Sequence, residues 1–175
     1  MMIRTVFIFL CVTFLLPATT VHAQSVTIDN SEYRHKVLQY LASDYFITEG
    51  LGLKKAYIGQ TLALLTSEVG KPVKSKRQGG LFSKSVINTY QLDKETALQA
   101  GIKNGKVQAL AVAGSVSSQY TTIKGARFGM PPHEIVNYYG ANKLKNNYLL
   151  YSKLGIRFDF KNNKLRIIRV FPAKK

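Results

Sequence analysis

The chain uses one pattern of residues twice, and this internal repetition limits its fold more than any other feature. Residues 58–71, IGQTLALLTSEVGK, align with residues 128–141, FGMPPHEIVNYYGA: each has an apolar residue, then a glycine, and a second glycine eleven positions after the first. Further along, residues 103–112, KNGKVQALAV, align with residues 161–170, KNNKLRIIRV. Two distinct blocks that recur in the same order indicate one structural unit used twice.

The first block of each pair predicts a short helix. Thr61 can cap the helix of the first copy, while Pro131 and Pro132 suit the first turn of the second, where a missing N–H loses no hydrogen bond. In each copy, two apolar residues four positions apart fall on one face, and a glycine follows where a left-handed residue would end the helix. These residues are Leu65, Val69 and Gly70 in the first copy, and Ile135, Tyr139 and Gly140 in the second.

The second block of each pair predicts a β-hairpin. Asn104-Gly105 and Asn162-Asn163 are residues that a two-residue turn with positive φ demands. Apolar residues alternate with others around both turns, and residues 86–92 and 147–152 precede them as further strands. Each unit is then a short helix followed by about three antiparallel strands, one face of which the helix covers. In the strand after each turn, alternation predicts that every second side chain lies on the same face. These residues are Val107, Ala109 and Ala111 in the first copy, and Leu165, Ile167 and Arg169 in the second.

The predicted fold is therefore of the α+β class, with two tandem repeats of a helix and an antiparallel sheet. We expect an N-terminal helix in residues 24–50, the first repeat in residues 51–114 and the second in residues 115–175. Residues 113–122, which are small and polar, are predicted to join the two repeats. One continuous sheet with a helix layer is the alternative arrangement of the same elements.

Residues 1–23 have the organisation of a secretory signal peptide. A basic start at Arg4 is followed by an apolar run from Val6 to Leu16, and small residues precede a predicted cleavage site near Ala23. A membrane anchor is the alternative, but the run is well short of the ~20 apolar residues that a spanning helix needs. We expect the mature protein to be periplasmic or secreted.

The mature chain lacks the residues that several kinds of site require. Cys11 is the single cysteine and belongs to the signal peptide, so the remainder can form no disulfide and no thiolate site. His133 and Glu134 begin a zinc-protease pattern, but Asn137 stands where its second histidine would be. We therefore predict no catalytic residues, no cofactor and no metal.

Charge is distributed unevenly along the chain. Without the signal peptide the net charge is +15, of which residues 24–70 carry −1 and residues 71–175 carry +16. Such asymmetry favours contact with something anionic, such as lipid headgroups, envelope polysaccharide, nucleic acid or an acidic protein face. A solvated basic surface without a partner is the alternative.

The first copy contains about 12 residues more than the second between the two blocks. We place the difference in residues 71–85, KPVKSKRQGGLFSKS, and predict a mobile basic loop with Leu81 and Phe82 at its tip. This loop would be either a contact finger or a solvated surface loop.

The repeated pattern resembles that of the BamE (SmpA/OmlA) envelope lipoproteins: an apolar residue, Gly, a short helix and a terminal Gly, then strands joined by a Lys-Asn-Gly-Lys hairpin. Doubled over about 150 residues, it is similar to the beta-lactamase inhibitor protein and to the tandem domain that precedes some bacterial CAP domains. The resemblance covers residues 55–112 and 125–171. It implies an exported, non-catalytic module whose sheet surface binds other proteins. The chain departs from these families in lacking a lipidated cysteine and disulfides.

We expect the protein to bind another envelope or secreted protein through its sheet face and the basic loop. Tyrosines in a basic setting, among them Tyr138, favour such an interface. The alternative function is a basic adaptor that attaches to an anionic envelope polymer, a lipid surface or nucleic acid. The candidate binding residues are Lys74, Lys76, Arg77, Leu81, Phe82, Tyr148, Tyr151, Arg157, Arg166 and Arg169.

Overall fold

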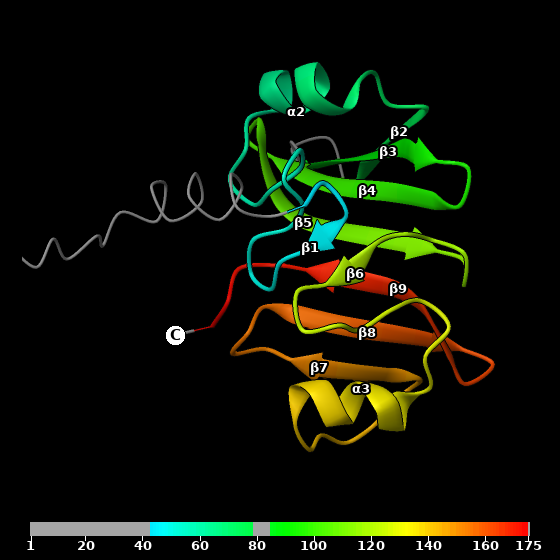
Figure 1. Ribbon diagram of the computed structural model, residues 1–175. Helices are drawn as coiled ribbons and strands as arrows, with labels where there is room; N and C mark the ends of the chain where they lie inside the picture. The colour runs from blue at the N-terminus through cyan, green and yellow to red at the C-terminus, as the bar shows by residue number, and fades with distance from the viewer. Residues whose placement is uncertain (1–42, 79–84, 175) are drawn as a thin grey trace, which may run out of the picture.

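The computed structural model describes residues 43–78 and 85–174. The predicted signal peptide, residues 24–42 of the predicted N-terminal helix, and Leu81 and Phe82 of the predicted loop lie outside these residues. The rest of that predicted helix, residues 43–50, contains turns and the short strand Phe46–Ile47 instead. The described part is an α+β fold built around a large antiparallel sheet, as the sequence predicts at the level of fold class (Figure 1).

In each half of the described chain a short helix precedes antiparallel strands, as the sequence predicts, and the short strands β1 and β6 precede the helices. The first half contains β1, α2 and strands β2 to β5, and the second contains β6, α3 and strands β7 to β9. Their bounds are β1 Phe46–Ile47, α2 Leu62–Val69, β2 Lys74–Gln78, β3 Ser85–Asp93, β4 Thr96–Lys103, β5 Lys106–Gly114, β6 Thr121–Thr122, α3 Pro132–Tyr139, β7 Tyr148–Tyr151, β8 Ile156–Lys161 and β9 Lys164–Val170.

Seven strands form one continuous sheet in the order β2-β3-β4-β5-β9-β8-β7. The two halves meet where β5 pairs antiparallel with β9, with Leu110 opposite Val170 and Ala113 opposite Ile167. A separate parallel pair, β1 with β6, ties the start of the first half to the start of the second. The strands of the two halves therefore share one sheet, which is the alternative arrangement that the sequence left open.

Local chemistry explains where the helices begin and end. The Thr61 hydroxyl accepts the Leu64 N–H at the start of α2, whereas Pro131 precedes α3 and Pro132 opens it. Gly70 and Gly140 end the helices with φ of 95° and 88°. Their ψ values of −172° and 167° are extended, so the predicted left-handed terminator is replaced by a conformation that is essentially confined to glycine.

Both predicted hairpin turns are present, but each returning strand contains a bulge that the sequence analysis did not foresee. The turn residues have positive φ, for example 52° at both Asn104 and Asn162. One extra residue follows in each hairpin, Gln108 in β5 and Arg166 in β9, and the register shifts there. The predicted alternation is therefore wrong beyond the bulges, where the residues on the core face are Leu110 and Val112 in β5, and Ile168 and Val170 in β9, although Ala111 on the other face is also only 8% exposed.

Two segments predicted as loops form strands instead. In the predicted basic loop of residues 71–85, Lys74–Gln78 is β2, an edge strand that pairs with β3. Lysine is common on edge strands because its charge discourages pairing with other chains, which explains why a strand here looked like a solvated loop. In the predicted linker of residues 113–122, Thr121–Thr122 is β6.

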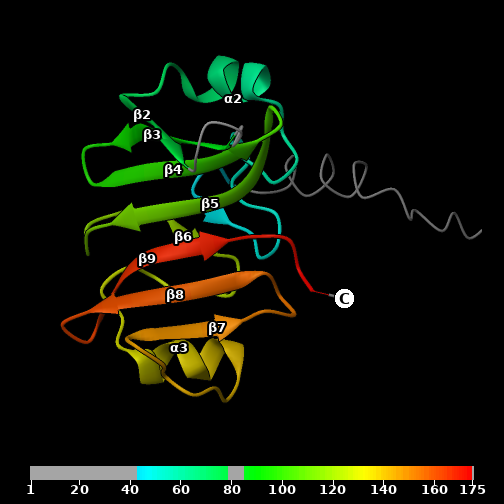
Figure 2. The same cartoon turned by 180° about the vertical axis from the view of Figure 1, so that it is seen from behind.

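The core lies on one face of the sheet. A single cross-strand row of buried side chains runs through six strands, with cross-strand partners meeting on the same face. α3 and the β1–β6 pair lie over this face, and α2 lies at its β2 end (Figure 1). Seen from behind, the opposite face carries no helix in the described part of the chain (Figure 2). The row consists of Tyr90, Leu98, Val112, Ile168, Phe158 and Leu149.

Candidate functional site

The uncovered face of the sheet, here called the open face, is defined by two cross-strand rows of side chains. The two rows lie on either side of the buried row. Their side chains point to the opposite face of the sheet because successive side chains alternate between the two faces of a strand. The first row contains Gln99, Ala111, Arg169, Arg157 and Leu150. The second contains Gln91, Ala97, Ala113, Ile167, Asp159 and Tyr148.

The strongest polar feature of the open face is a carboxylate held between two arginines. Arg157 lies directly opposite Arg169 on neighbouring strands. Arg157 Nε donates to one oxygen of Asp159 at 2.6 Å, an Nη of Arg157 forms an ion pair with the same oxygen at 2.5 Å, and Arg169 Nε donates to the other oxygen at 2.5 Å. The Asp159 side chain is 16% exposed, against 35% for Arg157 and 41% for Arg169. The acid is therefore shielded and the arginines face solvent.

Aromatic and apolar side chains border this cluster. The guanidinium carbon of Arg157 lies 3.9 Å from the ring centroid of Tyr148, a close cation–π contact. Leu150, opposite Arg157 on the edge strand, is 40% exposed, and Ile167 is partly exposed. Exposed apolar groups around a fixed arginine are the composition that protein interfaces favour.

Small residues occupy the open face beside this cluster. Ala109, which is exposed, lies opposite Gly101, and Ala111 lies opposite Gln99 in the next row. Ala109 is exposed and Gly101 is partly exposed, whereas Ala111 is only 8% exposed, so a partner can approach the backbone at Ala109 and Gly101.

The predicted basic residues of β2 are divided between the two faces. Lys74 and Lys76 share the open face, since Lys74 is opposite Thr89 and Lys76 is opposite Ile87. Arg77 is opposite Val86, which places it on the other face. Four strand spacings separate β2 from β9, or roughly 19 Å. The lysines and the arginine cluster therefore lie at opposite ends of the open face.

Two other predicted residues have different positions. Tyr151 lies on the covered face, where its ring packs against Tyr139 and Phe158 and its hydroxyl donates to the Gly140 carbonyl. Arg166 is the bulge residue of β9, and it lines a shallow pocket with Ala113 and Ile167 of the second row. The open face thus brings together Tyr148, Arg157, Arg166 and Arg169 of the predicted set.

Asp159 is a residue of the site that the sequence analysis missed. The sequence nevertheless contains a usable signal for it. Arg157 and Asp159 alternate with the apolar residues of β8, and this alternation puts both charges on one face, opposite Ile156, Phe158 and Phe160.

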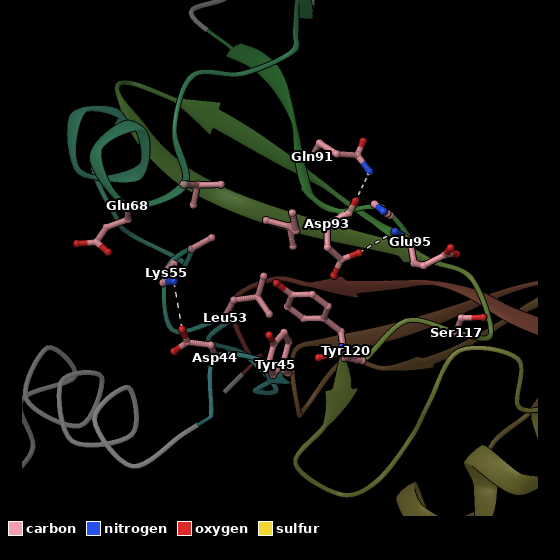
Figure 3. Close-up of a pocket in the computed structure, with 15 residues that line it drawn as sticks. Asp44, Tyr45, Leu53, Lys55, Glu68, Gln91, Asp93, Glu95, Ser117 and Tyr120 are labelled. Carbon is pink, nitrogen blue, oxygen red and sulfur yellow. Dashed lines mark hydrogen bonds and ion pairs between the residues drawn. The ribbon is translucent and has the colours of Figure 1, made fainter.

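A cavity of about 510 Å³ opens on the other side of the molecule, between the end of α2, the β3–β4 turn and the segments before β1 and β6 (Figure 3). The Tyr45 and Tyr120 rings meet edge to face at 5.4 Å. Burial raises the pKa of Tyr120 to about 12, and the negative charge of Asp93 adds to the shift. The charged lining residues are Asp44, Glu68, Asp93, Glu95, Lys55 and Lys94.

Most of these acids hold the chain's own loops together. Asp44 pairs with Lys55 and Lys54 at 3.1 Å each, and their hydrogen bonds lower the pKa of the Asp44 carboxyl. Asp93 accepts the backbone N–H of Glu95 at 2.7 Å, and the Glu95 carboxylate accepts the Ser115 hydroxyl. The cavity is thus lined by acids already used for structure, and the open face is the better candidate for binding.

Residues that could act in catalysis or metal binding are dispersed. His133 is an exposed residue of the first turn of α3. Within residues 43–78 and 85–174, no group of three or more His, Cys, Asp or Glu side chains is placed to hold a metal ion. In the same part of the chain, no helix is both long and apolar enough to cross a membrane.

No protein-family model matches the chain, and no curated protein matches it. Three solved structures are similar to it: an extracellular SCP-domain protein from Bacillus anthracis (13% identity, TM-score 0.46), a cysteine-rich secretory protein from Staphylococcus aureus (15%, 0.44) and a candidate beta-lactamase inhibitor protein from Streptococcus mutans (13%, 0.27). The matches cover 66%, 66% and 79% of this chain and 44%, 44% and 94% of the other chains.

The chain thus spans less than half the length of the first two proteins. These likenesses are loosely consistent with the resemblance seen in the sequence, which includes a CAP-associated domain and the beta-lactamase inhibitor protein. At TM-scores below 0.5 they carry no argument about function.

Proposed function

We propose that the protein is a non-catalytic binding module of the bacterial envelope that docks another protein on its open face. The observation that carries this proposal is the open face itself. It presents small side chains at Ala109 and Gly101, next to a fixed arginine cluster with exposed Leu150. A flat surface of small residues beside an anchored arginine and apolar groups suits a protein partner.

We further infer that the two halves are copies of one unit. In each half, an equivalent backbone hydrogen bond joins the glycine before the helix to the strand that follows the hairpin turn. Gly59 N–H donates to the Val107 carbonyl at 2.8 Å, and Gly129 N–H donates to the Leu165 carbonyl at 2.9 Å. The bulges also fall at aligned positions, Gln108 and Arg166. Shared irregular features of this kind support duplication better than shared helices and strands, which many unrelated folds contain.

The proposed location follows from the predicted signal peptide of residues 1–23, with cleavage near Ala23. An exported chain without cysteine in its mature part fits a bacterial periplasm or a secreted protein better than a small disulfide-stabilised domain. Cell fractionation with an antibody against the protein tests the location independently of any partner.

Affinity capture with a matched pair of variants tests the docking surface. Ala109→Arg places a bulky side chain on the open face, whereas Ala63→Arg places the same side chain on the exposed surface of α2. From an envelope extract, we expect Ala63→Arg to retain a discrete protein partner through a high-salt wash and Ala109→Arg to lose it. Loss with both variants, or with neither, would contradict docking on the open face.

The alternative function is a basic adaptor for an anionic polymer, lipid surface or nucleic acid. Lys74 and Lys76 on the open face, together with the mature charge of +15, favour it. The same experiment separates the two functions because the Ala109→Arg variant adds positive charge. Electrostatic attachment would strengthen in this variant and would be removed by salt.

A further inference from the structure

We propose that Arg157 and Arg169 form a clamp for a carboxylate, supplied by an Asp or Glu side chain of the partner protein. The inference rests on the proposed function and names the chemistry by which the open face recognises its partner. It is carried by the geometry of the two arginines, by the donors that Asp159 leaves unused, and by the composition of the surrounding face.

The two guanidiniums are held in place before any partner arrives. Asp159 accepts hydrogen bonds from both, one on each of its oxygens, and the Tyr148 ring lies against Arg157. All three charged residues come from the paired strands β8 and β9, whose backbones are fixed by the sheet. Long side chains that are already ordered lose less conformational entropy when they bind, which makes them effective anchors.

The clamp retains both charge and donors for a ligand. Two arginines against one aspartate leave a net charge of +1 at the cluster. Each guanidinium carries five N–H donors. Asp159 accepts the Nε–H of each arginine and forms an ion pair with one terminal nitrogen of Arg157, and within residues 43–78 and 85–174 no other acid pairs with either arginine. The other terminal N–H groups are therefore available for a second carboxylate.

The surroundings favour a carboxylate on a protein over a phosphate on a lipid or nucleic acid. The next positions along the cluster's row are Leu150 on one side and Ala111 on the other, and neither adds charge. Lys161 and Arg166 line a shallow pocket with Ala113 and Ile167 of the second row, whereas Lys74 and Lys76 of β2 lie roughly 19 Å from the cluster. A polyanion would engage these neighbouring cations as well, whereas one planar carboxylate needs only the fork of an arginine and fits between apolar Leu150 and Ala111.

Nuclear magnetic resonance of the arginine Nε–H groups tests the clamp without knowledge of the partner. The probes are a blocked peptide, acetyl-Gly-Leu-Glu-Leu-Gly-amide, the same peptide with Gln for Glu, and inorganic phosphate, each titrated into the mature protein. We expect the glutamate peptide to shift the Arg157 and Arg169 signals saturably, and the glutamine peptide to shift them at least tenfold less at equal concentration.

Two variants provide the matched comparison. Arg169→Lys keeps the charge and removes the fork, so we expect at least fivefold weaker binding of the glutamate peptide. Lys74→Gln with Lys76→Gln removes charge from the far end of the open face, so we expect binding unchanged within twofold. Equal effects of the two peptides, or no saturable shift, would overturn the clamp. Phosphate that binds tenfold more tightly than the glutamate peptide would overturn it in favour of a phosphate-bearing ligand.

Failure of the clamp and failure of the docking proposal can be told apart by capture with Arg157→Gln plus Arg169→Gln. If this double variant retains the partner that Ala109→Arg loses, the clamp is wrong and the docking face stands. If the unaltered protein retains no protein partner at high salt, the docking proposal itself fails.

Discussion

Arg157 and Arg169 lie directly opposite each other on β8 and β9, although like charges at such positions repel. Their proximity is sustained by Asp159, which accepts hydrogen bonds from both. This arrangement makes the carboxylate important for stability and leaves the arginines directed to solvent on the open face.

Removal of the shared carboxylate should destabilise the protein. For Asp159→Asn we expect a loss of about 1–2 kcal/mol in the free energy of unfolding, because the charged hydrogen bonds disappear and the two arginines repel each other. The side chains of the cluster are partly exposed, so the loss lies at the lower end of the range for such bonds. Urea denaturation measures it. Glu68→Gln, at an exposed position of α2, serves as the control and should change stability by less than about 0.5 kcal/mol.

The glycines that end the two helices should be intolerant of a side chain for reasons of backbone conformation alone. Gly70 and Gly140 have open space where a Cβ would stand, so Gly70→Ala and Gly140→Ala isolate the cost of their φ values. We expect each to lose about 1–3 kcal/mol of stability. Gly101→Ala is the control, since its φ is not positive and its new Cβ would make ordinary contacts of 3.6 Å or more. A loss of 1 kcal/mol or more at Gly101 and none at the other two would contradict this account.

A buried hydroxyl fastens α3 to the segment after β1. Tyr139 donates to the Glu49 carboxylate, and burial followed by this hydrogen bond raises the pKa of Tyr139 above its ordinary value. Tyr139→Phe should therefore lower the free energy of unfolding by about 1.5 kcal/mol. The neighbouring Tyr138→Phe removes an exposed hydroxyl and should cost less than about 0.5 kcal/mol. Equal effects of the two changes, measured by thermal denaturation, would show that the bond to Glu49 contributes nothing.

Stability should decline in alkaline solution partly through Tyr120. Its pKa of about 12 in the folded protein lies above the ordinary value of 10.0. Between these pH values the unfolded chain releases the phenolic proton more readily than the folded chain, so unfolding is favoured as pH rises. The contribution of Tyr120 to the free energy of unfolding is fully present below pH 10 and is lost as pH rises through 12. Urea midpoints between pH 9 and 12 should fall less steeply for Tyr120→Phe than for the unaltered protein.

The sequence was informative where one residue type determines the local backbone. Asn104 and Asn162 predicted both hairpin turns, and Gly70 and Gly140 predicted both helix ends, because few other residues adopt positive φ. The bulges at Gln108 and Arg166 were not predictable in this way, since an ordinary residue can occupy a bulge. The faces of both returning strands were misassigned as a result.

The site was predictable in part for similar reasons. Tyr148, Arg157 and Arg169 were candidates from composition, but their common location depends on the antiparallel pairing of β7, β8 and β9. That β5 would pair with β9 could not be derived, because register between distant strands is set by packing of the whole sheet. Consequently, the extent of the open face was visible only in the structure.

Site-specific photocrosslinking in the producing cells tests the central claim most directly. A photoreactive residue is placed on the open face at Gln99 or Ala109, or on the other side at Ile123, which is 49% exposed. Docking on the open face predicts a crosslinked product of one discrete mass from Gln99 and Ala109, and none from Ile123. A product from Ile123 alone, or no protein product from any position, would contradict the account.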